Sequence, residues 1–218
     1  MGSITRSFAN NITTSGVLLP ASLVNNSIAN VTAYNAAVST GGMVLLSSQT
    51  ASNSATISFT TGIDSTYKEY QFWFIDVHPR TDDTKFLFNG STDSGSNYNT
   101  TKTSTVFFSQ HTENDTSAEL SYDTFSDLAQ STDFQRLHTS GMANDADSSL
   151  GGSLTLFNPS STTYVKHFIA NTNSYYKDNA PTNTFIAGYC NTTSAVNAVQ
   201  FKFDSGNFDG TILLYGIV

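Results

Sequence analysis

The sequence predicts an all-β protein, an antiparallel β-sandwich of jelly-roll-like form with an extended N-terminal arm. Short runs of apolar and β-branched residues recur from about residue 42 onward, which suits strands that bury one face. Clusters of Gly, Asn, Asp and Ser separate these runs and favour tight turns. Almost no stretch has the spacing of an amphipathic helix, and no repeat of fixed period is present.

Residues 1–41 differ from the rest because their apolar residues follow neither a strand nor a helix pattern, and Gly41-Gly42 marks a joint. Apolar residues without a pattern usually pack on something else. We therefore expect an arm over 1–41 that docks on neighbouring molecules, followed by a sandwich domain over 42–218. An alternative is an N-terminal strand and loop folded on the chain's own domain. The apolar residues expected to dock are Ile4, Phe8, Ile12, Val17, Leu18 and Leu19.

The first strands are expected at 43–47 and 55–60, and a longer one at 68–77. In that third strand apolar residues occupy nearly every position from Tyr70 onward. Such a run is typical of a strand buried on both faces, so we expect Trp73 in the core. Pro79 has no N–H to donate to a sheet, so the strand should end before it.

Turn clusters divide the middle of the chain. Asn89-Gly90 and Asp93–Ser96 follow an expected strand at 85–89, while Gly151-Gly152 and Asn158-Pro159 flank another at 153–158. Residues 123–150 are rich in Asp, Ser and Gln and suggest a long surface loop. The remaining strands of this part are expected at 104–110, 118–122, 163–171 and 184–190.

The chain closes with two expected strands, 198–203 and 211–217, around a turn of Gly, Asn and Asp. In the first of them Val199, Phe201 and Phe203 alternate and should point the same way. The last one runs to the final residue without a polar tail. We therefore expect it to be paired within a sheet.

The 218 residues carry a net charge of −8, and only 12% of them are charged, against roughly 25% in ordinary soluble domains. The nine Lys and Arg residues form no basic run, so neither nucleic acid nor a membrane surface is an expected partner. The longest apolar runs fall far short of the roughly 20 residues that a spanning helix requires.

No catalytic or cofactor motif emerges, so we expect no enzyme activity, no cofactor and no metal site. Cys190 is the single cysteine and is expected to be a small buried strand residue. The four histidines lack metal-ligand spacing, and polar surface or strand-end positions are expected for them. The best carboxylate pairs are Asp145 with Asp147 and Asp82 with Asp83, but Ca²⁺ needs more oxygens than two carboxylates supply, so a solvated acidic turn is the interpretation.

Tyr175 and Tyr176 are the best candidates for a surface contact made by aromatic side chains. They fall in a polar segment, 171–183, which we expect to be a loop. Exposed tyrosines stack on sugars, but a structural role is the favoured interpretation for the pair.

Several motifs resemble a family of small virion structural, tail-fibre-like proteins of aquatic tailed bacteriophages, marine and cyanobacterial ones among them. The motifs lie at 63–70, 157–168, 187–189, 191–195, 205–210 and 214–216, and the opening residues 2–11 are similar as well. The resemblance extends over most of the chain, and its motifs are structural ones without catalytic residues.

The resemblance implies a virion protein made in the host's bacterial cytoplasm. The expected role is an exposed tail-fibre-type appendage that contacts the host surface, and the alternative is a capsid decoration (cement) protein of the phage head. The expected partners are further copies of the chain in a homotrimer, other virion proteins of the tail, neck or major capsid, and a host surface glycan. A third alternative, a carbohydrate-degrading depolymerase, lacks an arguable pair of carboxylates.

Overall fold

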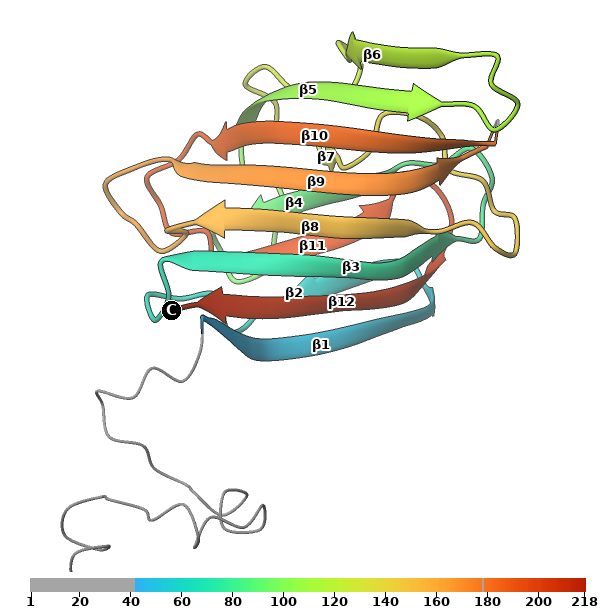
Figure 1. Cartoon of the computed structure of the whole chain (residues 1–218). Coiled ribbons are helices and arrows are strands. Elements are labelled where there is room, and N and C mark those ends of the chain that lie inside the picture. Colours follow the sequence, from blue (N-terminus) through green and yellow to red (C-terminus); the bar gives the residue numbers. More distant parts are fainter. Residues whose placement is uncertain (1–41, 178) are drawn as a thin grey trace, which may run out of the picture. The chain divides into compact units, whose positions relative to one another are not determined.

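A computed structural model describes residues 42–177 and 179–218, and twelve strands lie in this part of the chain (Figure 1). The expected arm, with Ile4, Phe8, Ile12, Val17, Leu18 and Leu19, lies outside the described residues. The strands are β1 (Met43–Ser54), β2 (Thr56–Phe59), β3 (Glu69–Pro79), β4 (Phe86–Ser91), β5 (Lys102–His111), β6 (Ala118–Tyr122), β7 (Gln135–Arg136), β8 (Leu150–Phe157), β9 (Lys166–Tyr176), β10 (Ala180–Cys190), β11 (Ala198–Phe203) and β12 (Phe208–Ile217).

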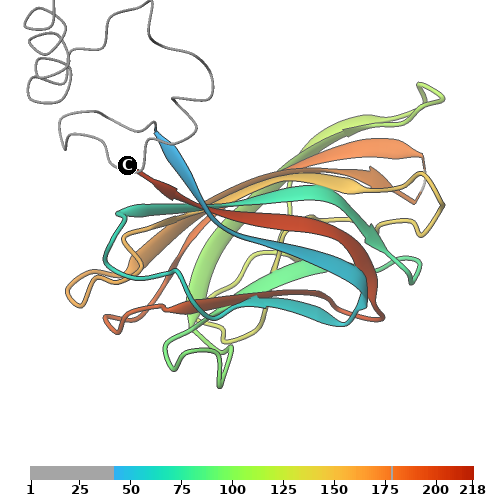
Figure 2. The same cartoon turned by 90° about the horizontal axis from the view of Figure 1, so that it is seen from below.

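The strands form two antiparallel sheets packed as a sandwich, as Figure 2 shows from the side. The larger sheet has eight strands in the order β1-β12-β3-β8-β9-β10-β5-β6, and the smaller has four in the order β2-β11-β4-β7. From β1 to β5 the chain changes sheet at each strand, which is the jelly-roll-like character of the topology. The predicted all-β sandwich is therefore confirmed.

Aromatic side chains fill the space between the sheets. Phe201 of β11 packs on Phe72 and Phe74 of β3, with ring centroids 5.1 and 5.3 Å away. Phe59 and Phe86 extend the cluster along the small sheet. Edge-to-face and stacked rings add to the burial of apolar area, so this cluster holds the two sheets together.

The prediction that the third strand is buried on both faces was wrong. In β3, Tyr70 and Phe72 are buried, whereas Trp73 is 41% exposed and Ile75 is 40% exposed. The strand therefore has one covered face and one open face, because the small sheet covers only one side of the large one. The strand does not end before Pro79, because Pro79 is the last residue of β3 and pairs in register with Phe208.

Three glycine-containing pairs expected in turns lie inside strands instead: Asn89-Gly90 in β4, Gly151-Gly152 in β8 and Asp209-Gly210 in β12. At Gly210, where φ is +126°, a Cβ would lie 2.7 Å from the carbonyl oxygen of Asp76. That contact is at the point where the register of β3 with β12 shifts. Glycine thus permits a bulge and a close approach of backbones there.

Residues 123–150 are not simply a surface loop. Gln135–Arg136 pair with β4 as the short strand β7, which the sequence did not reveal. Leu137, His138 and Met142 are fully buried behind it. The expectation was wrong because isolated buried residues in a polar, irregular segment produce no periodic signal.

Candidate interaction face

The outer face of the eight-stranded sheet, turned toward the viewer in Figure 1, is the main candidate site. Eleven large hydrophobic residues of the described chain are exposed, and eight of them belong to strands of this sheet. The eight are Met43, Leu45, Trp73, Ile75, Phe107, Leu120, Tyr122 and Ile169. Strand alternation and register place their side chains on the side away from the small sheet. We call this surface the outer face.

Cross-strand aromatic contacts run over the outer face. Trp73 and Tyr215 have ring centroids 5.5 Å apart, and the Trp73 indole N–H donates to the Gln71 side-chain oxygen at 2.8 Å. Phe107 stacks on Phe185 at 4.9 Å across β5 and β10. These pairs are ring contacts between strands on a solvent-facing surface, and such contacts stabilise the sheet.

Charge is nearly absent from the eight strands. Their charged residues are Glu69, Asp76, Lys102, Glu119, Lys166 and Asp209. Lys102 and Lys166 point inward and are buried. Asp209 accepts hydrogen bonds from Arg80, whose guanidinium contributes most to lowering the pKa of that carboxyl. The middle of the outer face is therefore uncharged.

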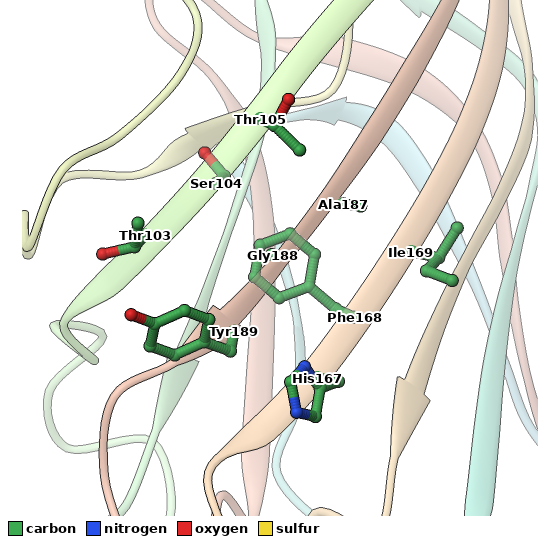
Figure 3. A pocket seen from close by; sticks show the side chains of 9 residues that line it. All are labelled: Thr103, Ser104, Thr105, His167, Phe168, Ile169, Ala187, Gly188 and Tyr189. Carbon is green, nitrogen blue, oxygen red and sulfur yellow. The ribbon is translucent and has the colours of Figure 1, made fainter.

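A shallow groove of about 480 Å³ crosses the outer face over β5, β10 and β9 (Figure 3). Ala187 and Gly188 lie at its floor, and the small side chain of Ala187 leaves room between the flanking side chains. Tyr189 and His167 stand near one end with ring centroids 6.1 Å apart, and Ile169 lies along one side. Apolar atoms dominate the lining, so the groove suits an apolar or aromatic group of a partner.

Tyr175 and Tyr176 are not in a loop, contrary to the prediction, because both lie in β9, which pairs with β10 over its whole length. The Tyr175 hydroxyl donates to Asn179 Oδ1 at 2.8 Å. Burial, and to a smaller extent nearby carboxylates, raise the pKa of this hydroxyl. Both tyrosines are half-buried. They lie roughly 25 Å along the strands from Tyr189, so the structure does not bring them to the groove.

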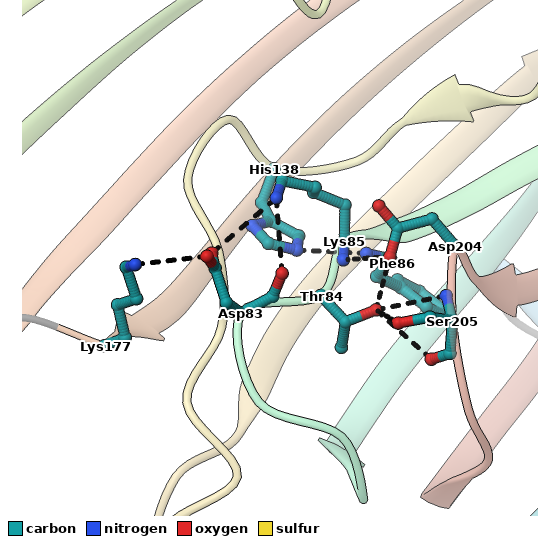
Figure 4. A network of polar contacts seen from close by, with 8 residues as sticks. All are labelled: Asp83, Thr84, Lys85, Phe86, His138, Lys177, Asp204 and Ser205. Atoms are coloured by element: carbon teal, nitrogen blue, oxygen red, sulfur yellow. Dashed lines mark hydrogen bonds and ion pairs between the residues drawn. The ribbon is translucent and has the colours of Figure 1, made fainter.

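A cluster of polar contacts near the start of β4 includes His138, whose pKa is shifted (Figure 4). His138, expected at a polar surface or strand end, is fully buried, and its Nε2 accepts the backbone N–H of Phe86 at 3.0 Å. Burial lowers its pKa to about 3, so the ring is neutral at physiological pH. Nearby, the ammonium group of Lys177 donates to Oδ2 of Asp83 at 3.1 Å. The hydroxyl of Thr84 donates to the carboxylate of Asp204.

The other candidates for chemistry lie apart from one another. Cys190 is buried as predicted. Asp145 and Asp147 are exposed in their turn, as expected. Over residues 42–177 and 179–218, no three His, Cys, Asp or Glu side chains are grouped so as to hold a metal ion. Within the same residues no helix has the length and apolarity to cross a membrane.

Comparison of the chain with protein-family models, with curated proteins and with solved structures gave no match. The resemblance to phage virion proteins thus rests on the sequence motifs and stays a prediction.

The outer face was not predicted from the sequence. The sequence did contain an indication of this face, because six charged residues over eight strands is an unusually small number for a sheet that faces solvent. Trp73 was assigned to the core because an apolar run does not reveal which of its two faces another sheet covers.

Proposed function

We propose that this protein is a non-enzymatic structural component of a bacteriophage virion, an exposed appendage of tail-fibre type whose subunits associate through the outer face. The observation that carries this proposal is the uncharged, aromatic outer face on a stable sandwich. The sequence motifs described above supply the virion context, and the face supplies a surface for assembly.

The electrostatics favour association through this surface. Each chain carries a net charge of −8, so two copies repel each other over most of their surfaces. On the outer face that repulsion is weakest, and burial of exposed rings is favourable. A homotrimer is the association that we propose for the appendage.

The face is also large enough. Eight strands at about 4.8 Å spacing and about ten residues at 3.3 Å give roughly 1,200 Å², against about 800 Å² per partner in a standard interface. A contact that covers most of the face would thus reach the size of a stable interface.

A capsid decoration protein is the second candidate. Its supporting observation is that the described chain is one broad sandwich without a repetitive shaft, a shape suited to lying on a shell. Contact with a host glycan belongs to the first role.

Copy number separates the two roles. Quantitative mass spectrometry of purified particles, with the major capsid protein as the internal standard, would give a ratio of a few per hundred for an appendage. A ratio near one to one, or one to a few, would favour decoration. Absence from particles would contradict both, and cleavage of a host glycan by the purified protein would contradict the non-enzymatic proposal.

A further inference from the structure

One contact between the two sheets joins a buried amine to a buried amide. Lys102 is the first residue of β5 in the large sheet, and Asn89 lies in β4 of the small sheet. Both side chains are fully buried. Lys102 Nζ donates to Asn89 Oδ1 at 2.6 Å and to the carbonyl oxygen of Thr100 at 2.7 Å. Among the ion pairs of the described residues, none includes Lys102.

The amide of Asn89 is held as an electrophile. Besides the lysine, its Oδ1 accepts the backbone N–H of Gly90 at 2.8 Å and the hydroxyl of Thr100 at 3.0 Å. Its Nδ2 donates to the carbonyl oxygens of Tyr98 and Thr132, each at 2.9 Å. Donors therefore surround the oxygen and acceptors surround the nitrogen, which fixes the amide orientation. Donors that converge on a carbonyl oxygen stabilise the negative charge that develops when its carbon is attacked.

The amine is suited to act as a nucleophile. Burial lowers the pKa of Lys102 to about 8, so roughly a tenth of it is neutral at pH 7 and more above that. A desolvated, neutral lysine is a competent nucleophile, whereas an ammonium is not. Burial outweighs the opposing effects of Cys190, which lies opposite Lys102 in register, and of Asp133, both of which raise the pKa of the lysine.

We propose that Lys102 and Asn89 form an intramolecular isopeptide bond across the sandwich. The lone pair of neutral Nζ attacks Cγ of Asn89, and the charge on Oδ1 is stabilised by Gly90 N–H and the Thr100 hydroxyl. The Cγ–Nδ2 bond then breaks, a proton passes from Nζ to the departing nitrogen, and ammonia leaves. The products are a secondary amide and one ammonia, and no oxidant or reductant is needed.

The bond would have a defined structural effect. It would tie β4 to β5 covalently, and so the small sheet to the large one, without a disulfide. A covalent link between residues 89 and 102 would restrict the conformations of the unfolded chain, much as a disulfide does. The proposal is independent of the virion role, since it depends only on contacts within one chain.

The test is the mass of the intact, freshly purified full chain. The expected mass is lower than that of the sequence by one ammonia, and a proteolytic map should contain a branched peptide that joins residues 89 and 102. Asn89-Gly90 also loses ammonia if it closes to a succinimide, so Lys102→Met is the first variant: it should have the full mass. Ammonia loss that persists in Lys102→Met would assign the loss to the succinimide and overturn the proposal.

Lys166 provides a matched control. It is equally buried and lies on the other side of Cys190, but its Nζ donates to the backbone oxygens of Tyr164 and Thr192. Lys166→Met should keep the branched peptide. If either variant fails to fold, the peptide map of the unchanged chain decides alone. Separate, unmodified peptides for residues 89 and 102 after incubation above pH 8 would overturn the proposal, as would a mass gain from deamidation of Asn89.

Discussion

The hydroxyl oxygen of Tyr70 lies 3.0 Å from both the backbone nitrogen and the backbone oxygen of Asp64. Tyr70 is fully buried at the start of β3, and its ring packs edge-on against Tyr67 at 5.8 Å. A core side chain thus satisfies backbone groups of the loop before β3. Hydrogen bonds with Thr66 and then Tyr70 lower the pKa of the Asp64 carboxyl.

Replacing this tyrosine tests how much the hydroxyl contributes. Tyr70→Phe should reduce the free energy of unfolding by about 0.5–1.5 kcal/mol, because the backbone groups of Asp64 lose their hydrogen bonds to the hydroxyl while the ring stays in place. Urea unfolding followed by fluorescence would measure the loss. Tyr164→Phe, at a residue that is 70% exposed, is the matched control and should change nothing. An unchanged midpoint for Tyr70→Phe would mean that water replaces the hydroxyl.

His138 predicts acid sensitivity. Burial lowers the pKa of His138 from 6.5 to about 3. Between these two pH values the histidine is protonated in the unfolded chain but stays neutral in the folded chain. Its contribution is therefore complete above pH 6.5 and is lost as the pH falls toward 3, by up to roughly 5 kcal/mol. Unfolding free energies measured by urea between pH 6.5 and 4.5 should decline as the pH falls.

The variant His138→Gln isolates this contribution, since glutamine keeps an acceptor for Phe86 N–H but does not titrate. Its stability should be lower at pH 7 and should vary less between pH 6.5 and 4.5. Carboxyls with lowered pKa, such as Asp93 at about 2, matter only below this window. An equally steep decline in the variant would exclude His138 as the source.

A charge placed on the outer face should disrupt association without unfolding the domain. Ile169 is 53% exposed beside the groove, so Ile169→Glu should shift a homotrimer to monomers in size-exclusion chromatography with light scattering. The folded monomer should lose at most about 0.5 kcal/mol, as is usual for exposed positions. Tyr164→Glu, an exposed loop position in no strand, is the control and should leave the trimer intact. A trimer that survives Ile169→Glu would place the interface elsewhere.

Deletion of residues 1–41 tests the expected arm. The sandwich over 42–218 has its own core, so the shortened chain should stay folded and soluble but no longer join particles. Circular dichroism would report folding, and the protein content of purified particles would report incorporation. An unfolded product would show instead that the segment belongs to the core, which is the alternative of a strand folded on its own domain.

Sequence reasoning found every strand whose apolar residues alternate. Val199, Phe201 and Phe203 predicted β11 with correct bounds, and residues 118–122 matched β6. The predicted strands were too short where neutral polar residues continue a strand. Thr172 and Ser174 of β9 and Thr182 of β10 are buried, yet they were assigned to a loop because Thr, Ser and Asn also favour turns.

The candidate site was less predictable for a physical reason. Whether an apolar strand residue is core or surface depends on which sheet covers it, and that is a property of the packed fold. Trp73 shows this, since its neighbours Phe72 and Phe74 are buried on the other face of the same strand. The contact of Lys102 with Asn89 also needs the stacking of two sheets, because the residues lie in different ones.

The N–H of Val218 donates to the carbonyl oxygen of Gly42 at 3.1 Å, so β1 and β12 bring the two ends of the described domain to one corner. For imaging, a fluorescent protein fused after Val218 would mark the corner of the domain at which Gly42 lies. An insertion in the 112–117 turn, next to the opposite edge strand β6, would mark the other side of the sheet. The line between the two labels would give the orientation of the sheet on a particle.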